Sequence, residues 1–315
     1  MKLSHLPTLL PLLTTLTSAL RTTSTPNCTR SCMTTIVNQI LDSILTHDPS
    51  TLPLAQQYRA TENSHPAALS MMTLWRTVTH APPPPNLLAI DTTTGSAYFA
   101  LDITEGSTPT PSNPTSQTQS VLWTRIKVQN QQITELEIYI NRSRGDHGFS
   151  FSPAELPHNY HRWMSPPSSR TKATRRDLES LSAATSNPNY NLTVTVASTC
   201  QLTEEGWRVV DPGPDGNGFY VPLWCSWPDI RPTDLNARLN LVIDEELGIV
   251  VTGAVGEGKE EWLRGKLEGG GGGLVRTGNA TGETLQVLQL YDGVLQGQQV
   301  MLYLSGPGMR SVWRD

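Results

Sequence analysis

The chain has 315 residues, a formal net charge of −5 and 16% charged residues. This length is sufficient for two domains with cores of their own. Lysine and arginine are scattered along the chain instead of clustered. The composition therefore argues against nucleic acid as a partner, because phosphate binding needs grouped cations.

Residues 1–19 have the features of an export signal. Lys2 supplies a positive charge, Leu6–Leu16 form a leucine-rich core, and Thr17-Ser18-Ala19 resemble a cleavage site. Two prolines interrupt the short core, and no other apolar run has the length needed to span a bilayer. We expect a mature protein in the secretory pathway, secreted or lumenal, without a stable membrane span.

The cysteines and the asparagines fit an exported protein. Four cysteines are an even number, and the most economical pairing joins Cys28 to Cys32 and Cys200 to Cys225. A zinc site is the alternative, but no second cysteine pair lies at ligand spacing near the first. Glycosylation sequons begin at four asparagines, which are Asn27, Asn141, Asn191 and Asn279.

The first mature segment is predicted to be helical over 31–46, because its apolar residues recur at intervals of three and four. Pro49 ends this helix, since proline disfavours helix in the residue before it. Residues 52–57 are predicted to form a short turn or helix, and 58–63 to enter a strand. A second apolar stretch follows at 71–78.

From Leu87 onward the pattern is that of β-structure. Along Ser96–Ile103, alternate residues make one apolar face and one mixed face that carries Tyr98 and Asp102. A hairpin is predicted next, with strands over 121–128 and 133–140. Helices followed by a sheet indicate an α+β fold in which helices cover one face of the sheet.

Part of this pattern occurs twice. The segment from Leu88 to Asp91 and Gly95 recurs from Leu241 to Asp244 and Gly248, and each copy is followed by a strand and a hairpin. The second hairpin has strands over 285–290 and 294–304, joined by a turn that contains Asp-Gly. The repeat indicates two related domains; the alternative is that any two hairpins look alike.

Between the two copies, residues 144–169 are predicted to be an irregular linker. Its three histidines suggest a metal site, but a solvated linker is favoured because no helix or strand is predicted to fix them: His147, His158 and His161. The second half continues with a weaker helix over 177–184 and a strand over 192–199. The predicted domains are 20–143 and 170–315.

The glycine run 269–273 is interpreted as a flexible loop, not a phosphate loop, and no cofactor site is predicted.

The motifs of the first half resemble a known family. Their order is Cys28-Thr-Arg-Ser-Cys32, His47-Asp48-Pro49, Thr61-Glu62-Asn63, Leu74-Trp75 and the hairpin over 128–137. This order is similar to that of secreted fungal proteins with a SnoaL-like, ketosteroid-isomerase-like fold, and 307–313 resemble the end of their second half. Two positions depart from the family pattern, Ser64 and the run 70–73, where glycines are usual.

The resemblance implies two tandem ketosteroid-isomerase-like cone folds, each a curved antiparallel sheet with helices on one face. Such a cone encloses an apolar pocket that suits a small hydrophobic ligand. Known enzymes of this fold move protons next to a carbonyl without a cofactor. A subset of the family is implicated in coupling alkyl maleic anhydride units in fungal nonadride (maleidride) pathways.

This chemistry needs a base and a hydrogen-bond donor for the developing enolate. Glu62 is the first candidate for the base, and the alternative is a structural glutamate that binds backbone amides. Asp102 is the second candidate, and the alternative is a surface charge. His65 and His47 titrate in a suitable range, although a histidine at a helix end, such as His47, is often a capping residue.

Tyr98 and Tyr139 are candidates for the donor, with packing as the alternative. Trp75 and Trp123 are expected to be pocket walls or core. We therefore expect a cofactor-free dimerising cyclase of secondary metabolism, with a small hydrophobic substrate and other pathway proteins as partners. The alternative is a non-catalytic secreted module that binds a small hydrophobic metabolite.

Overall fold

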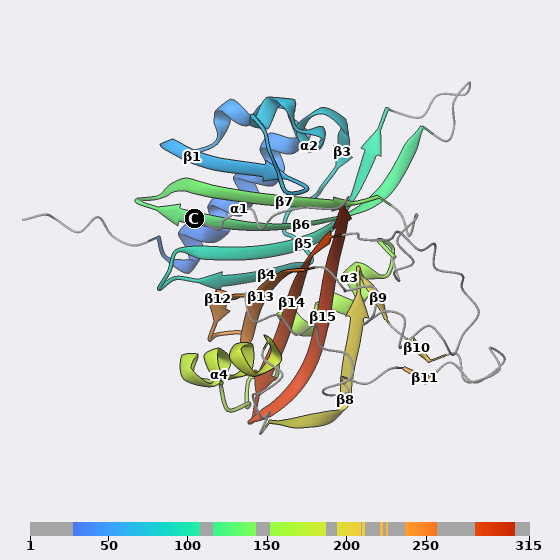
Figure 1. The fold of residues 1–315 in the computed structure, drawn as a ribbon. Coiled ribbons are helices and arrows are strands. Elements are labelled where there is room, and N and C mark those ends of the chain that lie inside the picture. Colours follow the sequence, from blue (N-terminus) through green and yellow to red (C-terminus); the bar gives the residue numbers. More distant parts are fainter. Residues whose placement is uncertain are drawn as a thin grey trace, which may run out of the picture.

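The computed structural model describes residues 28–107, 116–142, 152–186, 194–208, 210–211, 221–222, 225, 237–256 and 281–305. The predicted export signal, three of the sequons and the glycine run 269–273 lie outside these residues, as does the motif 307–313. The protein has an α+β fold with two mixed β-sheets and few helices (Figure 1).

The first half contains a seven-stranded sheet. Its strand order is β2-β1-β7-β6-β5-β3, and β4 also pairs with β5. The strands are β1 (Leu54–Glu62), β2 (His65–Pro66), β3 (Val78–His80), β4 (Leu87–Asp91), β5 (Ser96–Gly106), β6 (Gln117–Gln129) and β7 (Gln132–Asn141).

The second half contains a six-stranded sheet with the order β12-β13-β14-β15-β8-β9, and a separate pair of two-residue strands, β10 and β11. The strands are β8 (Thr195–Glu204), β9 (Trp207–Arg208), β10 (Val210–Asp211), β11 (Val221–Pro222), β12 (Arg238–Asp244), β13 (Ile249–Gly256), β14 (Thr281–Tyr291) and β15 (Val294–Ser305). Both predicted hairpins, β6–β7 and β14–β15, are confirmed.

The antiparallel arrangement predicted for each sheet is correct only in part. β1 pairs with β7 in parallel, and β8 pairs with β15 in parallel. Each of these pairs joins strands at opposite ends of its half, and residue alternation carries no information on the direction of a distant partner. The turn or helix predicted over 52–57 is also wrong, because a short 3₁₀ turn at Pro49–Thr51 leads directly into β1.

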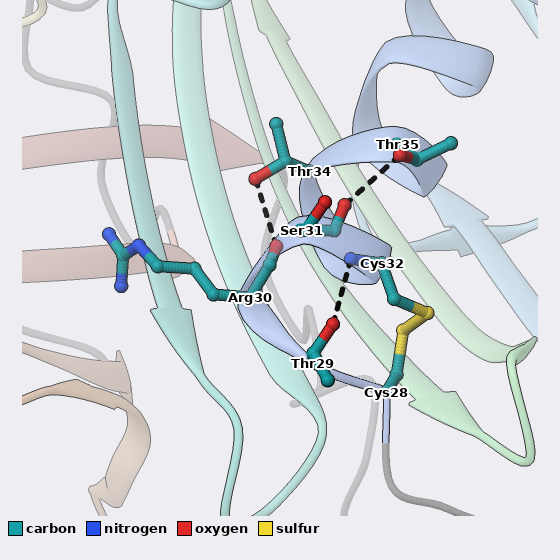
Figure 2. The surroundings of a disulfide bond; sticks show 7 residues. All are labelled: Cys28, Thr29, Arg30, Ser31, Cys32, Thr34 and Thr35. Carbon is teal, nitrogen blue, oxygen red and sulfur yellow. Dashed lines mark hydrogen bonds between the residues drawn. A yellow bond between two sulfur atoms is a disulfide. The ribbon is translucent and has the colours of Figure 1, made fainter.

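Helix α1 (Arg30–Leu45) confirms the first predicted helix. Six of its buried residues follow the three- and four-residue spacing and pack on the first sheet: Met33, Ile36, Val37, Ile40, Leu41 and Ile44. Figure 2 shows the disulfide between Cys28 and Cys32 at the start of the helix, where the Thr29 hydroxyl accepts the Cys32 N–H. The Arg30 side chain points away from this disulfide (Figure 2).

Three further helices lie between strands. Helix α2 (Thr73–Thr77) belongs to the first half, and α4 (Arg175–Ser186) confirms the weaker helix predicted for the second. Helix α3 (Leu156–Met164) lies in the segment predicted to be an irregular, solvated linker, and the irregular structure predicted there is wrong over these residues. His158 and His161 are exposed, as predicted for a solvated segment. Leu156, Tyr160 and Trp163 are buried on one face of α3, so packing against the sheets stabilises a helix that its proline and histidines obscure.

Helix α1 covers one face of the first sheet and α4 covers one face of the second, and we call these two faces the inner faces (Figure 1). The opposite faces of the two sheets pack against each other around a third apolar cluster. The mixed face of β5 therefore lies inside the protein and not in solvent. Its residues Tyr98 and Ala100 belong to the apolar cluster between the sheets. Other buried residues of this cluster come from the neighbouring strands and from the second sheet: Ala89, Trp123, Tyr139, Val251, Val287 and Met301.

The repeated sequence motif lies at this junction and binds reciprocally across it. Arg30 holds the Asp244 carboxylate through two hydrogen bonds of 3.0 and 2.9 Å, and Arg175 holds Asp91 through two of 3.2 and 2.6 Å. Asp244 also accepts the Ile90 N–H, while Asp91 accepts the Ile243 N–H. Each half thus contributes one arginine and one aspartate to the contact.

The glycines of the repeat have equal roles. Gly95 and Gly248 have φ of +69° and +70°, a region that favours glycine. A Cβ at Gly95 would overlap the carbonyl oxygen of Val128, and one at Gly248 would overlap that of Leu290. The Asp-to-Gly spacing of the repeat therefore marks the same tight turn in both halves.

Both predicted disulfides are present. The second joins Cys200, at the inner face of the second sheet, to Cys225, and both residues are buried. In the part of the chain that the structure describes, no helix is long and apolar enough to cross a membrane.

Candidate functional site

Glu62 occupies the last position of β1, beside helix α2. Its two carboxylate oxygens accept the backbone N–H groups of Thr73 (3.0 Å) and Leu74 (2.8 Å). These two groups open α2, where helices leave N–H groups without intrahelical partners. The contact is the structural role considered as the alternative for this residue, and it fixes the orientation of a half-buried carboxylate.

The other predicted site residues are dispersed. His65 lies opposite Glu62 in the β1–β2 pairing, is exposed, and has its Nδ1 2.7 Å from the Asn63 carbonyl oxygen. Asp102 is half-buried on β5. Tyr98 is fully buried between the sheets, and burial raises its pKa well above 10. Only Glu62 and His65 come together.

Trp75 and Trp123 are buried and have packing roles, whereas His47 is exposed and contacts the backbone. His47 follows α1 with a φ of +56°, and its Nδ1 lies 2.9 Å from the Trp75 carbonyl oxygen. The Trp75 indole donates to the Ser43 hydroxyl inside the first core. Trp123 lies between the sheets and stacks on Tyr139 with 4.0 Å between ring centroids.

Polar side chains lie at or next to the ends of β1, β5 and β7 in the first sheet and of β15 in the second. Arg142 forms an ion pair of 2.9 Å with Glu105, which also accepts the hydroxyls of Thr77 and Ser120. Tyr303, on β15 of the second sheet, is half-buried: burial raises its pKa, the Arg142 charge lowers it and the Glu62 charge raises it. We call Glu62, Glu105, Arg142 and Tyr303 the strand-end cluster.

Tyr139 connects this cluster to a buried ion network. Its ring lies 5.7 Å from that of Tyr303, and its hydroxyl lies 2.9 Å from the Ser64 hydroxyl and 3.2 Å from Glu137. Burial raises the Tyr139 pKa well above 10, and the negative charges of Glu283 and Glu137 raise it further. The phenol is therefore protonated at neutral pH and acts as a donor.

Two arginines balance the buried carboxylates of the network. Arg125 lies 3.8 Å from Glu137, and Arg238 pairs with both carboxylates. Arg238 lies 2.7 Å from Glu137 and 2.7 Å from Glu283, and it comes from β12 of the second half. Because breaking a buried pair leaves an uncompensated charge, this network ties the orientation of Tyr139 to the contact between the two sheets.

The second half repeats the Thr-Glu motif of β1, a feature that sequence reasoning missed. Glu62 pairs with Ile138 and Glu204 pairs with Val300, at matching places in the two sheets. The next residues, Asn63 and Glu205, have φ of +51° and +45°. The signal is visible in the sequence as Thr61-Glu62-Asn63-Ser64 and Thr203-Glu204-Glu205-Gly206.

Glu205 is a buried carboxyl group of this second copy. One of its oxygens accepts the Leu302 N–H, as the Asn63 side chain accepts the Ile140 N–H in the first half. Desolvation by burial raises the Glu205 pKa to about 8, the hydrogen bonds from Leu302 and Asn141 lower it, and the Glu204 charge raises it. Sequence reasoning did not identify this group, because an acidic pair before a glycine is typical of an exposed turn.

Asn141 is the one predicted glycosylation residue among those described. Its amide nitrogen, the atom that a glycan would occupy, donates to the Leu302 carbonyl oxygen at 2.8 Å, and the residue is half-buried. Glycosylation of this asparagine stays a prediction, as does that of Asn27, Asn191 and Asn279.

The surface has two hollows, one beside the strand that carries Glu62 and one over the contact between the two halves. A cleft of about 630 Å³ runs along the edge formed by β1 and β2, lined by Tyr58, Arg59, Ala60, Thr61, Pro66, Ala67 and Ala68. A smaller one of about 160 Å³ lies over the reciprocal Arg–Asp contact. Within the described residues, no group of three or more His, Cys, Asp and Glu side chains is placed to hold a metal ion.

Comparison with known proteins adds little to this picture. No family model matches the chain, and no curated protein matches it in sequence. The solved structures that are similar include AclR from Streptomyces galilaeus, with 8% identity, a TM-score of 0.29, and 36% of this chain and 81% of that chain covered. Another is a protein of unknown function with a cystatin-like fold from Methylobium petroleophilum, with 13% identity, a TM-score of 0.28, and 38% and 84% covered.

Likenesses of this size carry no argument about the activity of this chain. They do not support membership of the fungal SnoaL-like family, which stays a prediction from the sequence motifs. What the structure itself establishes is an α+β chain with two mixed sheets, two disulfides and polar clusters between and beside the sheets.

Proposed function

We propose that the protein is a secreted or lumenal enzyme that transfers a proton beside a carbonyl group without a cofactor, and that this transfer couples two alkyl maleic anhydride units. The observation that supports it best is the strand-end cluster. Two hydrogen bonds fix the Glu62 carboxylate, and the charges of Glu62 and of the Arg142 guanidinium group both act on the Tyr303 phenol, which is protonated at neutral pH. The family resemblance of the first half supplies the substrate class.

In this reaction Glu62 takes a proton from the carbon attached to the anhydride ring. The electron pair moves onto the carbonyl oxygen, to which Arg142 and the Tyr303 hydroxyl donate hydrogen bonds. The carbanion then adds to the carbon–carbon double bond of a second unit, and the adduct takes the proton back from Glu62. One carbon–carbon bond forms, and no group leaves.

Glu62→Gln should lower the rate of proton exchange by at least about 100-fold. The measurement is mass spectrometry of an alkyl maleic anhydride incubated with the protein in heavy water, scored for deuterium and for dimer. Glutamine offers one oxygen where Glu62 offers two, so one N–H of α2 loses its acceptor, at a cost of about 1–2 kcal/mol. Rates are therefore compared under conditions where urea titrations show both proteins folded.

Glu135→Gln is the matched control, because Glu135 is also a partly buried strand carboxylate in ion pairs, with Arg59 and Arg125. It should retain the wild-type exchange rate. Full exchange in Glu62→Gln would show that another group is the base.

Tyr303→Phe should lower the exchange rate by roughly 10–100-fold, because one donor to the enolate oxygen is lost. Tyr160→Phe is the comparison, since it removes a buried tyrosine hydroxyl that contacts the Met301 sulfur away from the cluster. Equal rates for the two variants would remove Tyr303 from the proposed site.

A second function, a non-catalytic module that binds a small hydrophobic metabolite, is favoured by two observations. Glu62 already serves as a helix cap, and the cleft along β1 and β2 has the volume of a small-molecule site. Binding of the anhydride in equilibrium dialysis, with no deuterium uptake in heavy water, would support this module over the enzyme.

A further inference from the structure

The inner faces of the two sheets differ in chemistry at matching positions. In the first sheet, Ala97 pairs with Ile126 and Thr124 with Ile138; in the second, Val250 pairs with Leu288 and Gln286 with Val300. Continuing these registers places Gln298 where the first sheet has Leu136, and Thr284 where it has Leu122. The second sheet is therefore polar at positions that are apolar in the first.

Three buried side chains of this polar face have atoms without hydrogen-bond partners. Gln298 is 0% exposed, and neither its amide nitrogen nor its amide oxygen has one. The same holds for the amide nitrogen of Gln286 and the hydroxyl of Thr284, which are 3% and 1% exposed. An unpaired buried polar group costs about 1–3 kcal/mol, so such groups normally have a partner.

The three side chains form one group. Thr284 and Gln286 are two residues apart on β14, and Gln298 lies two residues before the partner of Gln286 on the adjacent strand β15. Same-face neighbours at such positions lie about 5–8 Å apart. Gln286 is therefore the neighbour of both Thr284 and Gln298, and the three side chains form one continuous polar patch on the inner face.

The chemistry of the group defines the ligand class. Its unpaired atoms are amide donors, an amide acceptor and a hydroxyl, and none of them carries a charge. A charged ligand would be desolvated here without a counter-ion, which is costly. Val300 and Leu302 follow Gln298 on the same face of β15, so apolar side chains border the polar ones.

We propose that the inner face of the second sheet binds a small neutral polyhydroxylated molecule through Gln298, Gln286 and Thr284. This site is separate from the strand-end cluster and does not depend on the function proposed for it. In the first half, leucines at two of the matching positions fill the core around α1.

Ligand-observed saturation-transfer NMR on the full chain tests the site. The probes are myo-inositol and glucose, with cyclohexanol as a ring of equal size that carries a single hydroxyl. We expect transfer to myo-inositol or glucose at least fivefold stronger than to cyclohexanol. Absence of transfer to both polyols, or stronger transfer to cyclohexanol, would overturn the proposal and leave ordered water as the partner of these groups.

Two leucine variants locate the signal. Gln298→Leu restores the residue of the first half and should reduce the transfer at least fivefold. Gln299→Leu is the matched control, because Gln299 is the next residue on β15, is equally buried with an unpaired amide, and faces the other sheet. Thermal melts by circular dichroism confirm that both are folded. If the two variants give equal signals, the site is not on the inner face.

Discussion

Arg30→Ala and Arg175→Ala are each expected to lower the free energy of unfolding by about 3 kcal/mol or more, since each leaves a buried carboxylate without its counter-ion. The Asp244 and Asp91 side chains are 1% exposed, and each receives both of its charge-assisted bonds from the arginine of the other half. Such bidentate arginine–carboxylate pairs are among the stronger polar contacts in proteins. Loss of either arginine should therefore weaken the junction between the halves.

Urea unfolding followed by circular dichroism measures this loss. Arg176→Ala is the matched control on α4, because Arg176 is the exposed neighbour of Arg175, and it should change stability by less than about 0.5 kcal/mol. Arg30→Lys should lose part of the stability, since lysine keeps the charge but not the planar fork. If Arg175→Ala is no more destabilising than Arg176→Ala, the reciprocal contact does not hold the junction.

The repeat itself could be predicted from the sequence, but its reciprocal binding could not. Aspartate and glycine recur at a fixed spacing, and the spacing correctly marks one tight turn in each half. The arginines that bind the aspartates lie on helices of the opposite half, 84 and 214 residues away. No local pattern connects residues at that distance.

Hairpins and helices follow from local patterns, whereas the packing of the halves does not. The β6–β7 and β14–β15 hairpins were predictable from turn residues between alternating strands. The face of β5 with Tyr98 carries small and amphipathic residues, and such a face is compatible with water or with another sheet. In α3 the spacing of Leu156, Tyr160 and Trp163 was an available helical signal, and three histidines drew the interpretation toward a linker.

The candidate site could be predicted in part. Sequence motifs selected Glu62, and the structure places it at the strand-end cluster, but its hydrogen bonds to α2 depend on a turn that brings residue 73 back to residue 62. Tyr303 and Arg238 reach first-half residues from the second sheet, so only the tertiary structure connects them. Glu205 was hidden because burial, and not residue type, gives it an unusual pKa.

The stability of the protein is expected to fall as the pH rises from about 5 to about 8, because of Glu205. Its pKa is raised from 4.5 to about 8 in the folded protein, mainly by desolvation. Between these values the folded state holds a proton that the unfolded state has released, so raising the pH favours unfolding. Integrated over that interval, the effect is on the order of 4 kcal/mol, and it is fully lost above the folded pKa.

Urea unfolding of wild type and Glu205→Gln at several pH values from 5 to 8.5 tests this effect. The glutamine keeps an oxygen for the Leu302 N–H and resembles the protonated acid, so it should match wild type near pH 5 and exceed it near pH 8.5. Tyr98 and Tyr160 face Glu205, and since burial raises the pKa of both, neither titrates in this range. The two proteins differ only at residue 205, so the difference between them isolates Glu205. A difference that does not change with pH would mean that the Glu205 carboxyl is already ionised at pH 5 in the folded protein, and that Leu302 and Asn141 stabilise its charge more than burial opposes it.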